Sequence, residues 1–269
     1  MLRFQIAKFL GHLPYFPKQE FLIRKFYDPD QVYSGKIRKK IINKTIHGVV
    51  FECDTSSFLE WGIVIKKGEE RALLAFLLKK VQNTQFDHFY DLGANIGFFS
   101  LPMSRLIPTS SFEPFPVNNE TLRKNLSRNY GHNITIFDFG LSNSKDVKRL
   151  FFDKLSCNSG TPSMEKIGKD YVKIQTCVFD KEFLLKKQKL LFKIDIEGHE
   201  INALKGMKKT LTNNECFLYV ETINPEVVSF LEEWGYSVSY LNDNLFKNIK
   251  IVDRLKGHIL ATNKKSHNK

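Results

Sequence analysis

The chain has 269 residues, of which 42% are hydrophobic, so it is long enough for one large α/β domain with an appended segment. Its four cysteines stand far apart and form no C-x-x-C pair, which argues against a zinc ribbon or a disulfide framework and predicts reduced thiols in a cytoplasmic protein. No apolar run approaches the roughly 20 residues of a membrane-spanning helix, and polar residues near the start interrupt any signal-peptide core.

The net charge of +12 is compatible with a nucleic acid, an anionic membrane surface or an acidic substrate as partner. Lysine and arginine are nevertheless spread along most of the chain, in short clusters at residues 36–40, 186–189 and 205–209. Scattered charge of this kind is more typical of a solvated surface than of a nucleic-acid footprint.

The first 28 residues place apolar and basic side chains at a loosely helical spacing, and Pro14 and Pro17 divide them into two short pieces. The simpler interpretation is a helical arm that packs on the main domain. The alternative is a basic amphipathic helix that makes peripheral contact with an anionic membrane. The proline break favours the packed arm.

Residues 36–65 predict β structure, a small sheet or hairpin that includes a turn at Asp54–Ser57. Residues 69–81 then predict an amphipathic helix with a stripe of four leucines. We therefore expect an N-terminal extension over residues 1–83, a core α/β domain over residues 84–263, and a disordered tail over residues 264–269.

Residues 86–100 predict a strand, a tight glycine turn and a helix, which is the opening unit of a nucleotide-binding α/β domain. Asp91 ends the apolar run, and Gly93 and Gly97 flank Asn95. Glycine is expected where the backbone turns sharply and a ligand approaches it closely.

The turn does not match the dinucleotide motif G-x-G-x-x-G, because residue 95 is not glycine. An acidic residue directly before the turn suits a ligand with a sulfonium or an ammonium group, as in S-adenosylmethionine. Glu113 follows Gly93 by 20 residues, the spacing at which this kind of fold places the acid that binds the ribose hydroxyls.

The next segments continue the alternation of helices and strands. Residues 118–129 predict a helix with an Asn cap, and residues 134–139 predict a strand that ends at Gly140. Asp138 near this strand end is a candidate contact for an adenine edge, or simply part of the strand. Residues 145–180 predict two strands around a polar loop, a hairpin-like insertion that covers the substrate side.

Residues 189–211 restore the pattern with a buried strand, a cluster of acids and a helix. Another buried strand ends at Glu221, and Asn224 then caps a helix that is followed by a final strand pair. Ligands of open α/β sheets bind outside the carboxyl ends of the strands, so carboxylates repeated at these ends indicate a site.

The acids around Gly198 predict acid–base chemistry. Methylation of a hydroxyl requires removal of its proton, and Asp195, or His199 held by a carboxylate, would accept it. The same cluster offers oxygen ligands to a divalent cation. The structural alternatives are a satisfied histidine at 199, a helix cap at Glu197 and a core hydrogen-bond network at Glu221.

The segments FYDLGANIGFFS, SSFEPFPVNNETLRKNL, KIDIEGHEINALKGM and YVET together resemble the FkbM-type methyltransferase family, over roughly residues 45–225. The resemblance implies a class I, Rossmann-like fold with an open, mostly parallel sheet and helices on both faces. It also implies an S-adenosylmethionine-dependent enzyme, typically an O-methyltransferase of sugars, glycans or secondary metabolites. The chain matches the family motif at Asp91, Gly93, Asn95, Gly97, Glu113 and Asp195.

These considerations define two sets of candidate residues. The candidate catalytic residues are Asp195, Glu197, His199 and Glu221. The candidate cofactor-binding residues are Asp91, Gly93, Ala94, Asn95, Gly97, Phe98, Glu113, Pro114, Asp138, Gly140 and Asp195.

Two other function classes remain open at this stage. A nucleic-acid methyltransferase would use the basic surface, but the residues at 195–198 are D-I-E-G rather than an N-P-P-Y type tetrapeptide, and acids there would repel phosphates. A non-catalytic cofactor-binding module is disfavoured by the intact motif set. The sequence therefore favours a small-molecule or glycan acceptor over a nucleic acid. It leaves open the acceptor's identity, metal dependence and oligomeric state.

Overall fold

The computed structural model describes residues 2–13, 16–66, 70–153, 162–166, 168, 170–222, 224–241 and 257–263. Most of the predicted polar loop, Cys157 and the expected tail at 264–269 lie outside these residues. Within the described residues, Cys53, Cys177 and Cys216 are buried cysteines that form no disulfide. No helix among them is both long enough and apolar enough to cross a bilayer.

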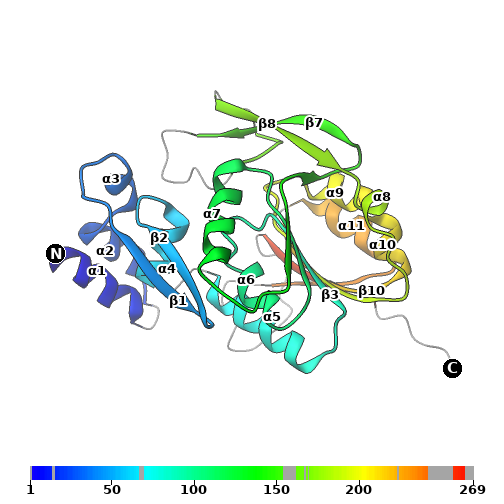
Figure 1. The fold of residues 1–269 in the computed structure, drawn as a ribbon, viewed down its shortest axis with the longest axis horizontal. Coiled ribbons are helices and arrows are strands. Elements are labelled where there is room, and N and C mark those ends of the chain that lie inside the picture. The colour runs from blue at the N-terminus through cyan, green and yellow to red at the C-terminus, as the bar shows by residue number, and fades with distance from the viewer. Residues whose placement is uncertain are drawn as a thin grey trace.

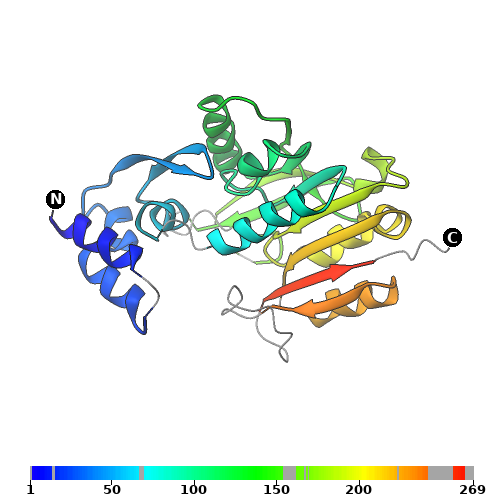
Figure 2. The same ribbon diagram turned by 90° about the horizontal axis from the view of Figure 1, so that it is seen from below.

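The described residues form a central sheet of seven strands, in the order β11-β12-β10-β9-β3-β4-β5. Among these seven strands, β12 alone runs opposite to the other six, and Figure 2 shows it between β10 and β11. The open, mostly parallel sheet of the expected class I methyltransferase fold is thereby confirmed. The strands are β3 (His88–Leu92), β4 (Thr109–Phe112), β5 (Ile134–Phe137), β9 (Lys189–Ile194), β10 (Glu215–Glu221), β11 (Ser237–Tyr240) and β12 (His258–Thr262).

Helices cover both faces of this sheet, because successive side chains of each buried strand point to opposite faces. In β3, Phe89 joins the core on one face, whereas Tyr90 and Leu92 join the core on the other. The first face is covered by α5 (Arg71–Asn83), α6 (Ser100–Ser104) and α7 (Pro116–Ser127). The second is covered by α8 (Phe179–Glu182), α9 (Glu200–Gly206), α10 (Lys208–Asn213) and α11 (Pro225–Glu233).

A small separate sheet is built from β6 (Gly140–Leu141), β7 (Asp146–Phe152) and β8 (Asp170–Cys177). The pairing of β7 with β8 is antiparallel, as expected for the two strands around the polar loop. Figure 1 shows this sheet above the main body, over α7 and α9.

The N-terminal extension lies at the opposite end of the molecule from α8 and α10 (Figure 1). It contains α1 (Leu2–His12), α2 (Gln19–Phe26), α3 (Pro29–Tyr33), β1 (Ile41–Ile46), β2 (Val49–Asp54) and α4 (Phe58–Lys66). The division into two helical pieces and the β-hairpin are confirmed. One apolar core includes residues of this extension and of the central sheet, such as Phe4 and Phe89. The domain boundary at residue 83 stays a prediction.

The prediction of β structure for residues 58–65 is wrong, because α4 occupies this segment. The five residues Trp61–Ile65 are all buried, so the segment shows no amphipathic period that would distinguish a helix from a strand. The backbone N–H of Trp61 donates to the carbonyl of Ser57 at 2.8 Å, and its indole N–H donates to the carbonyl of Tyr27 at 3.0 Å. Tertiary burial decides the conformation here.

Three other boundaries differ from the prediction. Helix α7 starts at Pro116, with Phe115 as its N-cap, instead of being capped by Asn118. The strand predicted at 134–139 ends at Phe137, and the helix predicted at 201–211 is interrupted at Met207 between α9 and α10. Asn224 does cap α11, accepting the N–H of Glu226 at 2.9 Å.

Candidate active site

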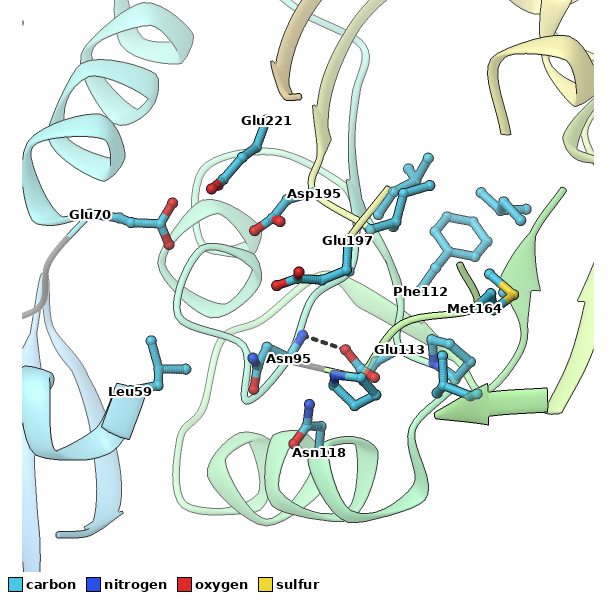
Figure 3. Close-up of a pocket in the computed structure, with 18 of the residues that line it drawn as sticks. Leu59, Glu70, Asn95, Phe112, Glu113, Asn118, Met164, Asp195, Glu197 and Glu221 are labelled. Atoms are coloured by element: carbon cyan, nitrogen blue, oxygen red, sulfur yellow. Dashed lines mark hydrogen bonds between the residues drawn. The ribbon is translucent and has the colours of Figure 1, made fainter. Parts of the chain in front are cut away.

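A cavity of about 550 Å³ opens at the carboxyl ends of the parallel strands. This is the position at which open α/β sheets bind ligands, and the volume lies within the usual range for small-molecule sites. Figure 3 shows the side chains that converge on it from the ends of β9 and β10, from the residue before α5 and from the turn after β3. Its lining includes Gly93, Asn95, Glu113, Pro114, Gly140, Asp195, Glu197 and Glu221 from the candidate sets.

The glycine turn after β3 packs tightly against its neighbours. Gly93 has φ +81°, and a Cβ there would lie 1.8 Å from the carbonyl oxygen of Asp195. Gly97 has φ +89°, and a Cβ there would lie 2.3 Å from Leu122 Cδ1. The turn therefore needs glycine for its left-handed conformation and for internal packing, a reason that differs from the expected ligand approach.

Glu113 is held against the cavity wall by two backbone amides. Its Oε2 accepts the N–H of Asn95 at 2.7 Å, and its Oε1 accepts the N–H of Phe115 at 2.9 Å. Burial raises the pKa of Glu113 to about 7, although these hydrogen bonds oppose the shift. Each carboxylate oxygen keeps a second lone pair, so Glu113 can also accept a ligand hydroxyl.

Asp91 does not occupy the position expected for a cofactor contact. Its side chain is buried on the α6 side of the sheet, outside the described lining of the cavity. The hydroxyl of Ser100 donates to Asp91 Oδ2 at 2.5 Å. Burial raises the pKa of Asp91, and Lys193 opposes that rise. Ala94, Gly97 and Phe98 are likewise absent from the described lining, so the structure gives these four candidates a role in packing.

Lys193 is a residue beside the cavity that was not among the candidates predicted from the sequence. Only 2% of the residue is exposed, and its Nζ donates to Asp195 Oδ2 at 2.9 Å and lies 3.8 Å from Asp91 Oδ1. Burial would lower the pKa of Lys193, but Asp195 and Asp91 raise it above its ordinary value, so the side chain is a fixed cation. The sequence does contain a signal for this ion pair, which is a lysine inside an apolar strand and two residues before an acid.

One end of the cavity is acidic. Glu70 precedes α5 and faces Asp195 and Glu221 across the cavity (Figure 3). These three residues can each place one carboxylate oxygen within 4.8 Å of the others. Burial, followed by the charges of Asp195 and Glu70, raises the pKa of Glu221 to about 8. Three oxygens at this separation could contact one divalent cation, and the metal stays a prediction.

Glu197 lines the same end but is not a helix cap. Its Oε2 pairs with Lys166 Nζ at 3.1 Å, and its φ of +53° places it in the left-handed region. Glu200, the first residue of α9, bonds to the backbone just before the helix, because its Oε1 accepts the N–H of Gly198 at 2.9 Å. The N-cap residue of α9 is His199, which makes no side-chain cap hydrogen bond, so the cap proposed at Glu197 is not formed.

His199 is not placed to accept a proton from a substrate in the cavity. It is 1% exposed and lies outside the described lining. Its Nδ1 lies 2.6 Å from Glu165 Oε1 and its Nε2 lies 3.0 Å from Ser142 Oγ, so both ring nitrogens are engaged within the protein. Burial lowers its pKa. Asp138 is exposed and also outside the described lining, so neither candidate is supported by the geometry.

His258 lines the acidic end and was also missed. Because β12 is antiparallel, its first residue lies at the carboxyl edge of the sheet, and the strand register pairs His258 with Glu221. His258 Nδ1 lies 2.6 Å from the hydroxyl of Tyr219 and 4.0 Å from Glu221 Oε2. The sequence predicts β12 as part of a final strand pair, but it does not show which strand β12 pairs with. For this reason the sequence alone does not place His258 beside Glu221.

Residues 91–238 match the family model of the methyltransferase FkbM domain. The chain belongs to the FkbM methyltransferase family. Methyltransferase sdnD of Sordaria araneosa is 29% identical over 189 residues, which cover 55% of this chain and 73% of that protein. Hexuronic acid methyltransferase AglP of Haloferax volcanii is 28% identical over 183 residues, which cover 66% of this chain and 72% of that protein.

Among solved structures, methyltransferase FkbM from Methylobacillus flagellatus KT is 14% identical with a TM-score of 0.43, covering 90% of this chain and 60% of that one. At this level the similarity carries no information about the substrate. Family membership makes the chain a methyltransferase. The strand order makes its fold that of a class I methyltransferase.

The cavity of this FkbM-family chain has the chemistry that S-adenosylmethionine requires. An apolar section can take a flat ring, Glu113 beside it can take hydroxyl groups, and the acidic end can take positive charge. The side chains of the apolar section are Phe112, Pro114, Leu141, Leu150, Pro162 and Met164. The donors and acceptors present therefore fit this cofactor.

Proposed function

We propose that this chain is an S-adenosylmethionine-dependent O-methyltransferase whose acceptor is a hydroxyl of a neutral sugar or glycan. The observation that carries the proposal is the division of one cavity into a nucleoside-like section around Glu113 and an acidic section around Asp195 and Glu221. An acceptor hydroxyl bound in the acidic section would lie next to a cofactor bound in the other section. Methyl transfer requires the two reactants to be held close together in this way.

The cofactor would be held mainly by the residues after β3 and β4. Glu113 would accept hydrogen bonds from ribose hydroxyls, and the apolar section would pack on the adenine ring. Asp195 would face positive charge on the cofactor. The bound cofactor supplies an electrophilic methyl group, and the chain's own residues perform the remaining tasks.

The acceptor would lie against the N-terminal extension. Phe58 and Leu59, at the start of α4, give the cavity an apolar face, and Glu70, Glu221 and His258 give it hydrogen-bond acceptors. A sugar presents C–H groups on its ring faces and hydroxyls around its edge, so a surface of this mixed kind is complementary to it. The relative AglP, a hexuronic acid methyltransferase by name, supports a carbohydrate acceptor.

The charge of the site favours a neutral sugar over a uronate. Four carboxyl groups line the acidic section, those of Glu70, Asp195, Glu197 and Glu221, and the ionised ones would repel an acceptor carboxylate. Glu221 is the best-matched proton acceptor, because a pKa of about 8 lies close to neutral pH and leaves a useful fraction ionised. Its neighbour His258 offers a second site for the proton.

A methyl-transfer assay tests the proposal. The purified protein and cofactor labelled on the methyl group are incubated separately with neutral oligosaccharides, uronic-acid oligosaccharides and RNA. We expect label in the neutral sugars, loss of at least about a hundredfold in rate for Glu221→Gln, and little change for Glu120→Gln on the outside of α7. The proposal would be refuted by label that appears only in RNA. It would also be refuted if product analysis finds the methyl group on an amine nitrogen rather than on an oxygen.

A further inference from the structure

The outer surface of the N-terminal helical hairpin carries large apolar side chains. Leu2, Phe9 and Phe21 are 74%, 65% and 58% exposed. In α1, the buried residues Phe4, Ala7 and Gly11 form one face, and Leu2 and Phe9, seven residues apart, lie on the opposite face. Exposed apolar side chains gathered on one small element indicate an interaction surface rather than chance exposure.

Basic side chains accompany these apolar ones. Arg3, Lys18 and Lys25 are exposed, and Lys25 Nζ lies 4.6 Å from the centre of the Phe21 ring. Each of the three acidic side chains among residues 2–33 pairs with a basic side chain, and residues 2–33 carry five lysines and arginines. Glu20 pairs with Lys66 at 2.7 Å, and Asp28 and Asp30 pair with Arg24 at 3.4 and 2.6 Å. The outward-facing charge of the hairpin is therefore positive.

The hairpin is anchored through contacts that leave its outer side chains available. A Cβ at Gly11 would lie 2.3 Å from the carbonyl oxygen of Ile65, so α1 packs closely on α4. The rings of Phe4 and Tyr27 meet edge to face at 5.0 Å, and the side chain of Gln19 donates to the carbonyl of Leu10 at 2.8 Å. Phe9 stands three residues before the end of α1, and Phe21 is the third residue of α2.

We propose that the α1–α2 hairpin binds an anionic lipid surface, with Phe9 and Phe21 in the acyl–headgroup boundary and the adjacent lysines on lipid phosphates. Apolar side chains beside cations are the pattern of interfacial helices, and the net charge of +12 attracts the whole chain to such a surface. A second copy of this chain, equally positive, is the less complementary occupant. The structure thus favours the membrane interpretation that the prolines had argued against.

Binding of this kind would leave α4 between the membrane-bound hairpin and the cavity. Helix α1 packs on α4, and the first residues of α4, Phe58 and Leu59, form the apolar face of the cavity. The inference rests on the hairpin alone. It holds or fails whether or not the acceptor is a sugar.

Vesicle sedimentation with the full chain tests the inference. We expect binding to vesicles of phosphatidylcholine with 30% phosphatidylglycerol, and none to pure phosphatidylcholine. Phe9→Gln and Phe21→Gln should each weaken the partition coefficient about tenfold, because each removes one inserting ring without changing the charge. Val117→Gln on α7, at a residue 62% exposed, is the matched control and should leave binding unchanged.

Three outcomes would overturn the inference. The first is no binding of the wild type to the anionic vesicles. The second is equal binding by the wild type and the Phe9→Gln/Phe21→Gln double variant, because this would show that net charge alone attracts the protein. A dimer in sedimentation analysis that the double variant abolishes, without vesicle binding, would identify a second copy as the occupant. As an independent readout, Phe9→Trp fluorescence should be quenched by brominated anionic lipid, and unquenched emission would contradict insertion.

Discussion

Lys193 Nζ donates to Asp195 Oδ2 at 2.9 Å from a side chain that is almost entirely buried. The same ammonium lies 3.8 Å from Asp91 Oδ1, which is fully buried behind the strand. One buried cation therefore orients the carboxylate that lines the cavity and offsets the charge of the carboxylate that does not. The acid of the glycine-turn motif thus belongs to the support of the site rather than to its lining.

Removal of this cation should destabilise the protein strongly. Lys193→Met would leave Asp91 buried without its opposite charge, and breaking a buried pair in this way costs about 3 to 5 kcal/mol of unfolding free energy. Urea denaturation measures the loss. The double variant Asp91→Asn/Lys193→Met should recover most of it, since no isolated charge remains. A double variant as unstable as the single one would show that the lysine acts through packing alone.

Gly93→Ala should cost more stability than its positive φ explains. The added Cβ would meet the Asp195 carbonyl oxygen at 1.8 Å, so β3 and β9 would have to separate, and we expect a loss of about 3 kcal/mol or more. Gly131 is the control, because it has φ +74° and open space around its Cβ. Gly131→Ala should cost about 1 kcal/mol. Equal losses in thermal or urea unfolding would contradict the packing explanation.

The affinity for S-adenosylmethionine should rise with pH because of Glu221. This carboxyl is largely neutral at pH 7 and ionises as the pH passes about 8, and the ionised form attracts a cationic ligand. We expect the Kd measured by calorimetry to fall about threefold to tenfold between pH 6.5 and 9. Glu221→Gln should reduce this dependence to the part contributed by Glu113, whose pKa is raised to about 7. A pH profile that the variant shares with the wild type would place the titration elsewhere.

Glu60 should make the protein less stable as the pH rises. Burial raises its pKa to about 7, so between pH 4.5 and 7 the unfolded chain loses this proton first and the folded state is penalised. Glu60→Gln removes the penalty, while Gln can still accept the N–H of Asp54 that Glu60 accepts at 2.5 Å. We expect the variant to gain about 1 to 3 kcal/mol over the wild type at pH 8 and little at pH 4.5.

Denaturation midpoints at the two pH values check this prediction. Glu232 is exposed on α11, and Glu232→Gln should show no comparable gain at pH 8. A constant difference between Glu60→Gln and the wild type across the pH range would mean that Glu60 titrates alike in the folded and unfolded chains.

The sequence alone determined the alternation of strands and helices, the edge of the sheet that holds the site, and the residues that end its strands. Glu113, Asp195 and Glu221 could be placed at the cavity because hydrophobic periodicity and glycine turns are local signals, and parallel strands bring their carboxyl ends to one edge. The family resemblance came from the same local motifs.

Tertiary structure decided which neighbouring polar groups face the cavity. Asp91 points away from it because side chains alternate along β3, and His199 is drawn to Ser142 and Glu165, which are distant in sequence. Lys193 and His258 gained their roles from pairings between strands, which depend on register and on the antiparallel insertion of β12. Such contacts join residues as far as about a hundred positions apart, such as Asp91 and Lys193, and no local pattern encodes them.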